Sequence, residues 1–259
     1  MSEGALAEAR RRVAAARRVV VLTGAGVSTE SGIPDFRGPN GRWRQRAAAE
    51  RPGGLAEYVG DEAVRTRAWQ RRLGSPALRA RPNAGHRALV ELERQGRLVA
   101  LLTQNVDGLH LLAGSDPAKV VELHGTIREV VCVACGARGP AQATLERVRA
   151  GEADPRCRGC AGVLTSATVG FGQPLDAGDL RRAVRAVQSC DVLLAVGTSL
   201  RVYPVAGLVP LAADGGTAVV IVNGEPTPFD ELAVAVVRAP IGAALPAIVG
   251  ELSPVPRRC

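Results

Sequence analysis

Four stretches of aliphatic residues recur along the chain, and each follows a segment with helical spacing of its apolar residues. The stretches are RVVVLTG (18–24), LVALLTQ (98–104), CDVLLAVG (190–197) and TAVVIVNG (217–224), preceded by helical segments 5–17, 84–95, 177–188 and 204–213. Strands that are apolar on both faces and alternate with helices predict an α/β fold with a parallel sheet covered on both sides. Each stretch ends in a polar or glycine-rich turn, where open α/β sheets bind ligands.

Two segments interrupt this alternation. Residues 36–82 are rich in arginine, glycine and proline and predict a loop followed by short helices. Residues 128–163 hold four of the six cysteines and predict a small metal-binding module. We interpret both as insertions into one nucleotide-binding domain, which comprises residues 1–35, 83–127 and 164–259.

The first strand leads into the glycine-rich turn GAGVSTESGIPDFRG (24–38). Gly24 and Gly26 would let backbone N–H groups approach a phosphate at a helix N-terminus. The turn is not the dehydrogenase fingerprint, because Thr29 stands at the third glycine position and Arg44 stands where an acidic ribose ligand would lie. A tight strand-to-helix turn with no ligand is the alternative interpretation.

Hydrogen-bonding side chains follow the second strand in TQNVDGLH (103–110). Asp107 could accept from a carboxamide NH2 group, and Asn105 could fix a water or a ribose hydroxyl. A polar turn closed by capping is the alternative. In the first turn, PDFR (34–37) adds an acid, an aromatic ring and a cation on a stiffened loop, a combination that is uncommon in a purely structural turn.

Polar residues also follow the two later strands. Small hydroxyls and N–H groups in Gly197-Thr198-Ser199 can hold phosphate. Asn223 and Glu225 can hold ribose hydroxyls, so the acidic ligand that is missing after the first strand is expected from the other half of the sheet.

The chain has three histidines. We expect His86 and His110 to be structural, as lone histidines usually are. His124 follows the apolar run VVEL (120–123) and precedes a glycine, which predicts a strand end facing the crevice. An imidazole in that place is suited to act as a general base near neutral pH.

The cysteine spacing is the most specific signal in the chain. Two CxxC pairs are separated by 21 residues, and their members are Cys132, Cys135, Cys157 and Cys160. Such pairs suit one tetrahedral Zn2+, and four cysteine ligands leave no position for water, so the zinc is expected to be structural. Cys190 and Cys259 have no partner by spacing and are expected to be buried or incidental thiols.

No apolar run reaches the roughly 18 residues that span a bilayer, and the N-terminus lacks the apolar core of a signal peptide. We therefore expect a cytoplasmic protein with no membrane partner. In that reducing compartment its cysteines are expected to be metal ligands or free thiols rather than disulfide partners.

The net charge of +8 favours anionic partners such as nucleotides or nucleic acid. A zinc-ribbon nucleic-acid-binding protein is therefore an alternative hypothesis. However, residues 132–160 contain no aromatic side chain on which bases could stack, and acidic residues are interspersed among the arginines there. No specific nucleic-acid partner is expected.

Together these motifs resemble the sirtuin family of NAD-dependent protein deacylases, and in part its mitochondrial-type subgroup. The matching strings are GAGVSTESGIPDFRG, TQNVDGLH, ELHG, the two CxxC pairs, VGFG (169–172), GTSL (197–200) and IVNGEP (221–226). They follow the family's order over about residues 18–250. The resemblance implies a Rossmann-like domain with a small zinc-ribbon module (128–163) and an insertion (36–82) made of a cofactor loop and helices, with NAD and an acyl-lysine protein meeting between them.

The resemblance also implies roles for individual residues. The turn and cofactor loop would contact NAD through Gly24, Ala25, Gly26, Asp35, Phe36 and Arg37. The nicotinamide pocket would comprise Gln104, Asn105 and Asp107. The adenosine half would be held by Gly197, Thr198, Ser199, Asn223, Glu225 and Ile241. His124 would be the catalytic base and Asn105 would also take part in catalysis, while the substrate backbone would pair with Val169, Phe171 and Gly172.

The implied reaction transfers an acyl group from lysine to ADP-ribose, releasing nicotinamide and O-acyl-ADP-ribose. ADP-ribosyl transfer to protein, or NAD hydrolysis, is the alternative on the same scaffold. Two features of the chain depart from the family pattern. Gln173 stands where many relatives carry an acid, which removes one attraction for basic flanks of the peptide. Trp69 and Arg72 have a spacing similar to that of the Tyr-x-x-Arg pair that recognises acidic acyl groups, but a different chemistry, so the acyl preference stays open.

Overall fold

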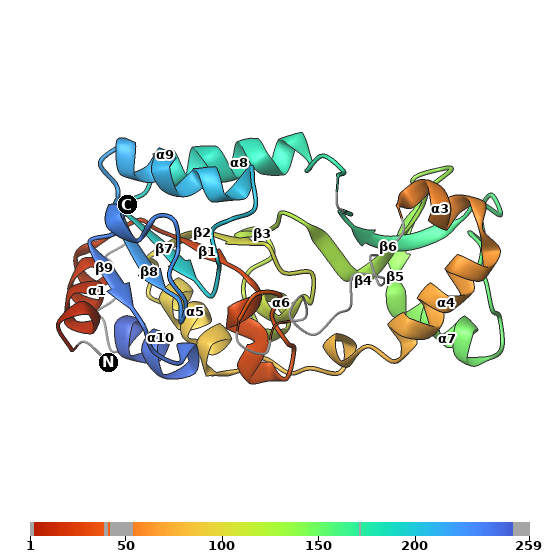
Figure 1. The fold of residues 1–259 in the computed structure, drawn as a ribbon, viewed down its shortest axis with the longest axis horizontal. Coiled ribbons are helices and arrows are strands. Elements are labelled where there is room, and N and C mark those ends of the chain that lie inside the picture. The colour runs from red at the N-terminus through yellow and green to blue at the C-terminus, as the bar shows by residue number, and fades with distance from the viewer. Residues whose placement is uncertain (1–2, 39–40, 42–53, 171, 251–259) are drawn as a thin grey trace.

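A parallel six-stranded sheet forms the centre of the protein, in the strand order β3-β2-β1-β7-β8-β9 (Figure 1). The computed structural model describes residues 3–38, 41, 54–170 and 172–250. The strands are β1 (Val19–Thr23), β2 (Leu98–Thr103), β3 (Val120–Glu122), β7 (Val192–Val196), β8 (Ala218–Val222) and β9 (Ala235–Val237). From β1 the chain adds β2 and β3 on one side, and from β7 it adds β8 and β9 on the other. Open α/β sheets bind ligands at such a reversal of strand order, which here lies between β1 and β7.

The strand register brings the carboxyl ends of the central strands to one level. Thr23 at the end of β1 pairs with Thr103 at the end of β2 and with Val196 at the end of β7. Val196 in turn pairs with Val222, the last residue of β8. The four turns that the sequence singles out therefore begin side by side along one edge of the sheet.

Helices cover both faces of the sheet, because successive residues of each strand point to opposite sides. Val19 and Val21 lie in the core beneath α1 (Glu3–Ala15), α5 (Ala84–Arg94) and α10 (Ile241–Val249). Val20 and Leu22 lie in the core beneath α8 (Ala177–Gln188) and α9 (Leu208–Asp214), which form the upper layer in Figure 1. This arrangement confirms the predicted α/β, Rossmann-like fold class.

The predicted helices and strands differ from the structure mainly at their ends. The expected helix 204–213 divides into a short 3-10 segment, η3 (Val205–Gly207), and α9. The helix expected after the first strand is η1 (Ala25–Ser31), also a 3-10 segment, and the 3-10 segment η4 (Asp230–Leu232) precedes β9. Periodicity did not predict β9, because three residues are too few to show an alternation.

A second, antiparallel sheet lies at the other end of the molecule, with the order β5-β4-β6 (Figure 1). Its strands are β4 (Gly125–Cys132), β5 (Arg138–Pro140) and β6 (Leu164–Thr168), and α7 (Ala141–Arg149) follows β5. This sheet begins and ends a few residues outside the predicted module 128–163. The division of the chain into domains stays a prediction.

The helices of the first insertion pack against this second sheet. They are α3 (Leu55–Gly60), α4 (Glu62–Leu73) and the 3-10 segment η2 (Pro76–Leu78), as expected for short helices. Trp69 of α4 is 1% exposed and shares a core cluster with Leu145 and Val148 of α7. The buried Arg65 guanidinium pairs with Asp154 at 2.8 Å. Both insertions are therefore joined to each other by an apolar core and an ion pair.

Among the residues that the structure describes, no helix has both the length and the apolar character needed to cross a membrane. The short helix α6 (Leu109–Ala113) lies in the connection between β2 and β3, after the turn that follows β2.

Candidate active site and metal centre

The turns after β1 and β7 are in direct backbone contact. The N–H groups of Gly24 and Gly26 donate to the carbonyl oxygens of Val196 and Gly197, at 3.0 and 2.8 Å. A Cβ on Gly26 would lie 2.8 Å from the Cα of Gly197, and a Cβ on Gly197 would lie 2.4 Å from the nitrogen of Val27. The glycines thus allow the two turns to touch. The sequence motif predicts a different role for these glycines, which is to let the backbone approach a phosphate.

The polar residues after β2 are buried and oriented by their neighbours. The Asn105 amide Nδ2 donates to the carbonyl oxygen of Gly24 at 3.0 Å and to Ser28 Oγ at 3.3 Å. Ser28 Oγ donates to Asp107 Oδ2 at 2.7 Å, and the N–H of Leu109 donates to Asp107 Oδ1 at 2.9 Å. Each carboxylate oxygen has two lone pairs, so Asp107 retains the capacity to accept from a ligand.

Ser28 is the residue at this site that sequence reasoning missed. It lies inside the motif GAGVST, but no spacing rule marks it. Its hydroxyl connects Asn105 and Asp107, which both follow β2, to the turn after β1.

Gln104 bridges the turns after β2 and β7. Its Nε2 donates to Thr198 Oγ1 at 2.9 Å, and its backbone N–H donates to the carbonyl oxygen of Thr23. The predicted residues Gln104, Asn105 and Thr198 are therefore brought together at the carboxyl ends of the three central strands.

His124 follows β3 and lies half-buried beside the same turn. Its Nδ1 is 2.9 Å from the carbonyl oxygen of Gln104. A carbonyl oxygen only accepts hydrogen bonds, so Nδ1 carries the proton and Nε2 is left as the nitrogen that can take one up. The next residue, Gly125, has a φ of 72°, and a Cβ there would lie 2.1 Å from the carbonyl oxygen of Ala167. Only glycine can make this tight passage from β3 to β4.

The segment after β6 is tied to His124 through the backbone. The N–H of Val169 donates to the carbonyl oxygen of His124 at 2.9 Å. Gly172 has a φ of 80°, and Phe171 lies outside the described residues. Gln173 accepts from the N–H of Gly170 through Oε1 at 2.6 Å, so its side chain closes this turn.

The PDFR segment lies next to the turn after β7. Asp35 Oδ1 accepts from the N–H of Gly38 at 3.0 Å, and Arg37 Nη1 donates to Ser199 Oγ at 3.5 Å. Burial, together with the nearby Arg201, lowers the pKa of the Arg37 guanidinium. The Phe36 side chain is 42% exposed, and Ala25 is half-buried in η1.

The residues predicted to hold adenosine continue along the same edge. The N–H of Gly197 donates to the carbonyl oxygen of Val222, which places Asn223 beside the turn after β7. Asn223 Nδ2 donates to the carbonyl oxygen of Glu225 at 2.7 Å. The Glu225 side chain is exposed, whereas Ile241 at the start of α10 is buried in the core. The predicted ligand roles of these residues stay predictions.

The four CxxC cysteines converge at one end of the second sheet. Their sulfur atoms all lie within 4.8 Å of one another, so the four thiols could hold a metal ion. Cys132 and Cys160 are separated by 3.5 Å, and Cys135 and Cys157 by 3.8 Å, between sulfur atoms. A tetrahedral metal with sulfur at about 2.3 Å needs separations of about 3.8 Å. Within the cluster, the backbone N–H of Cys135 lowers the pKa of the Cys132 thiol to about 6. The backbone N–H of Gly162 acts to lower the pKa of Cys160, but its neighbours Cys135 and Cys132 raise it to about 12.

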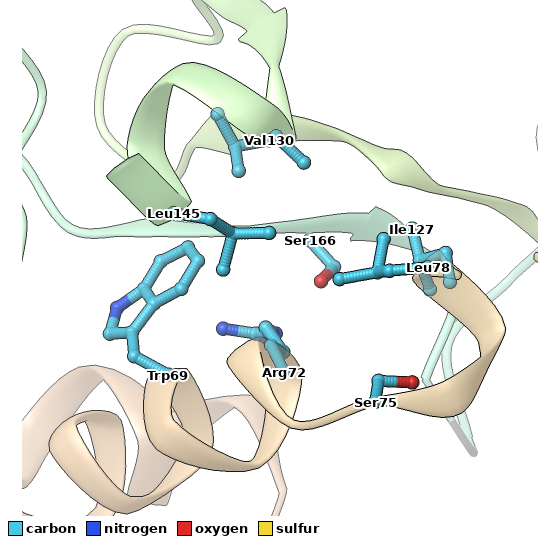
Figure 2. A pocket seen from close by; sticks show the side chains of 9 residues that line it. Trp69, Arg72, Ser75, Leu78, Ile127, Val130, Leu145 and Ser166 are labelled. Carbon is cyan, nitrogen blue, oxygen red and sulfur yellow. The ribbon is translucent and has the colours of Figure 1, made fainter. Parts of the chain in front are cut away.

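Arg72 is engaged within the protein. It lines a cavity of about 40 Å³ together with Trp69 and side chains from β4, β6 and α7, which face it in Figure 2. Its guanidinium lies 4.5 Å from the centroid of the Trp69 ring and donates to Tyr58 Oη at 2.9 Å and to Thr165 Oγ1 at 3.3 Å. Arg72 therefore joins α4 to α3 and to β6 of the second sheet, which the spacing comparison with a Tyr-x-x-Arg pair did not indicate.

A larger cavity of about 370 Å³ lies at the outer edge of β3. Glu122 lines it, and burial raises the pKa of this carboxyl to about 7. His86 and His110 are buried, as expected for structural histidines. Cys190 is also buried, as expected, and Cys259 lies outside the described residues.

Comparison with known proteins matches both the sequence and the fold. A sequence model of the Sir2 family matches residues 24–204. A protein of Streptomyces coelicolor, NAD-dependent protein deacetylase 2, is 55% identical over 234 residues, which cover 90% of this chain and 97% of the relative. The NAD-dependent protein deacetylase of Rhodopseudomonas palustris is 42% identical over 92% of this chain and 94% of its own.

Solved structures of Sir2 proteins have the same fold as this chain. A Sir2 structure with a deacetylated p53 peptide and 3'-O-acetyl-ADP-ribose superposes with a TM-score of 0.83 at 32% identity, covering 95% of this chain and 98% of its own. A Sir2 structure with a p53 peptide and NAD+ has a TM-score of 0.81 at 32% identity, covering 93% and 95%. The sirtuin resemblance is thereby confirmed, and the chain belongs to the Sir2 family.

Proposed function

We propose that this protein is an NAD-dependent protein lysine deacetylase that releases nicotinamide and O-acetyl-ADP-ribose. The names of the Streptomyces and Rhodopseudomonas relatives support this reaction, as do the NAD+ and acetyl-ADP-ribose complexes of the related structures. The observation in this structure that carries the proposal is the orientation of His124, whose Nδ1 is fixed by the Gln104 carbonyl beside the buried Asn105 and Asp107.

The donor set along the sheet edge fits a dinucleotide. Asn105 and Asp107 supply an amide and a carboxylate for the nicotinamide end, with Gln104 beside them. Gly24 and Gly26 let the turn after β1 lie directly against Gly197 and Thr198. In this proposal the two joined turns, with Ala25 and Ser199, border the phosphates. At the far end, Asn223 and Glu225 would hold ribose hydroxyls and Ile241 would border adenine.

NAD, when bound, supplies a glycosidic bond whose cleavage releases nicotinamide and makes the ribose an acceptor for the acyl group. His124 Nε2 would take up a proton from a ribose hydroxyl, while Nδ1 keeps its proton on the Gln104 carbonyl. Arg37 contacts Ser199 in the turn after β7, and with Asp35 and Phe36 it would keep water from the ribose carbon while nicotinamide leaves. One water is then consumed when the amide bond of the acetyl-lysine breaks and the lysine amine is released. Asn105 would fix the geometry of the reacting groups.

The acyl-lysine protein would bind along the segment after β6. Val169 and Gly172 lie there, with Phe171 between them outside the described residues. Because the Val169 N–H is bonded to the His124 carbonyl, a peptide aligned on this segment would lie next to the base. In this proposal α3, α4 and the second sheet form one side of the substrate cleft, and the six-stranded sheet with its helices forms the other.

The metal ion is proposed to be one structural Zn2+. Four thiol ligands whose sulfur atoms lie within 4.8 Å of one another fit zinc and leave no open coordination position. Reduced thiols of this kind are typical of the cytoplasm, which is the location we propose.

The experiment is a reaction with NAD and an acetyl-lysine peptide, analysed by mass spectrometry. Free lysine peptide and O-acetyl-ADP-ribose in equal amounts are expected, and His124→Ala should abolish both while the circular dichroism spectrum stays unchanged. ADP-ribosylated peptide or free ADP-ribose as the main product would instead support the transferase or hydrolase alternative. If NAD is not consumed with acetylated, succinylated or longer-chain acyl peptides, the proposed function is wrong.

A further inference from the structure

A chain of buried hydrogen bonds leads from His110 to the backbone of Asn105. His110 Nε2 lies 2.9 Å from Thr23 Oγ1. Thr23 Oγ1 donates to Thr103 Oγ1 at 2.9 Å, and the backbone N–H of Asn105 donates to the same Thr103 oxygen at 3.1 Å. The four residues come from α6, β1, β2 and the turn after β2, and all four are buried.

In the arrangement that the structure gives, the Thr23 hydroxyl donates to Thr103. The Thr23 oxygen then accepts from His110 Nε2. His110 therefore carries its proton on Nε2 and is the donor at the start of the chain. Thr103 Oγ1 accepts from both Thr23 and Asn105, which uses both of its lone pairs.

His110 is held in this neutral form by its surroundings. Burial lowers the pKa of His110 well below its usual range, and the neighbouring His86, with ring centroids 4.8 Å apart, lowers it further. His110 Nδ1 has no hydrogen-bond partner among the described residues, so a second proton would be unsatisfied there. The charged groups near the pair are Asp107, which acts to raise the pKa of His86, and Arg87, which acts to lower it.

We propose that His110 is a positioning residue for the turn Gln104–Asp107, acting on the Asn105 backbone through Thr23 and Thr103. The inference rests on the proposed function, in which this turn binds the nicotinamide end of NAD. Asn105 is fixed at two places: its side chain by Gly24 and Ser28, and its backbone N–H by the Thr103 oxygen. A buried histidine that only filled space would be replaceable by an apolar residue of similar volume with no effect on this turn.

Two substitutions distinguish a His110 that acts as a hydrogen-bond donor from one that only fills space in the core. In His110→Gln, the side-chain amide can reach the place of Nε2 and still donate to Thr23. In His110→Leu, the volume is nearly kept but the donor is lost. A stability control is Leu92→Ala, in α5 near the opposite end of the sheet, which leaves the hydrogen-bond chain untouched.

In steady-state kinetics, His110→Leu should raise the KM for NAD about tenfold, a factor that corresponds to about 1.4 kcal/mol. The KM for the acetyl-lysine peptide should not change, because the peptide does not bind to this turn. His110→Gln should restore the KM for NAD to near the wild-type value. Leu92→Ala should lower the melting temperature at least as much as His110→Leu while leaving the KM for NAD unchanged.

A second measurement uses the protein without NAD. In hydrogen exchange followed by NMR, the Asn105 amide should exchange about tenfold faster in His110→Leu than in wild type, and His110→Gln should restore its protection. Thr23→Val should have the same effect, and the double variant should add nothing further, since both changes break one chain.

Equal KM values and equal Asn105 exchange in wild type and His110→Leu would overturn the inference. So would additive effects of His110→Leu and Thr23→Val. If the wild-type protein shows no NAD-dependent reaction but the exchange results hold, the positioning of Asn105 stands and the proposed function is what fails.

Discussion

His124 Nδ1 lies 2.9 Å from the main-chain carbonyl oxygen of Gln104, and this contact decides which ring nitrogen can act as a base. Gln104 is itself held to β1 through its N–H and to Thr198 through its side chain. The proposed base is therefore oriented by the same turn that is proposed to bind nicotinamide, so the two parts of the proposed site are positioned together.

His124→Asn tests this orientation. The asparagine amide can replace Nδ1 as a donor to the Gln104 carbonyl, but it has no group in the place of Nε2. We expect a folded protein whose kcat for deacetylation is about 10²–10⁴-fold lower, the usual contribution of a positioned base. The measurement is formation of O-acetyl-ADP-ribose by mass spectrometry, with thermal melting as the control. A kcat near that of wild type would show that Nε2 is not the proton acceptor.

Ser28→Ala removes the hydroxyl that connects Asn105 and Asp107. Asp107 loses one donor and Asn105 loses one acceptor, so both side chains are held less firmly. Because NAD would then have to order these side chains as it binds, we expect its affinity to fall about tenfold, which corresponds to about 1.4 kcal/mol. The affinity is measured by calorimetry. Ser189→Ala, at the other end of the sheet, is the matched control and should bind NAD as wild type does.

The buried His86 predicts a loss of stability in acid. Burial lowers its pKa from 6.5 to about 4 in the folded protein. The unfolded chain therefore binds a proton at a higher pH than the folded one, and the free energy of unfolding falls as the pH decreases from about 6.5 to about 4. Each unit of pH in this window costs up to about 1.4 kcal/mol, or about 3 kcal/mol in total.

The measurement is denaturant unfolding of wild type and His86→Leu between pH 7.5 and 4.5. Other groups titrate in both proteins, so the difference between the two curves isolates His86. We expect a smaller decrease in the variant. Parallel curves would contradict the lowered pKa.

Removal of the metal should unfold the second sheet locally. Without a cation, no metal–sulfur bonds hold the four cysteine sulfur atoms together, although they converge within 4.8 Å. We expect chelation, or Cys132→Ala, to increase hydrogen exchange in β4, β5 and α7 while the six-stranded sheet stays protected. Activity should fall indirectly, because α4 packs on α7 through Trp69. Purified protein with no bound zinc, or exchange that rises equally in both sheets, would contradict this account.

The sequence by itself determined the class of fold and much of the site. Runs such as RVVVLTG and CDVLLAVG are apolar throughout because both faces of a central parallel strand are buried, and that local pattern is visible without coordinates. The two CxxC pairs predicted the cysteine cluster because each pair closes a short turn. Motifs after the strands identified Asn105, Asp107 and His124 as candidates because strand ends converge in such sheets.

Only the tertiary structure decided which of these residues touch. The bonds from Ser28 to Asp107 and from Thr23 to Thr103 span 79 and 80 residues, and they exist because parallel pairing sets the ends of β1 and β2 level. Likewise, Arg65 meets Asp154 only because two separate insertions pack together. Periodicity and motif spacing describe the burial of each segment along the chain. Strand order and register result from packing between distant segments, which no local pattern encodes.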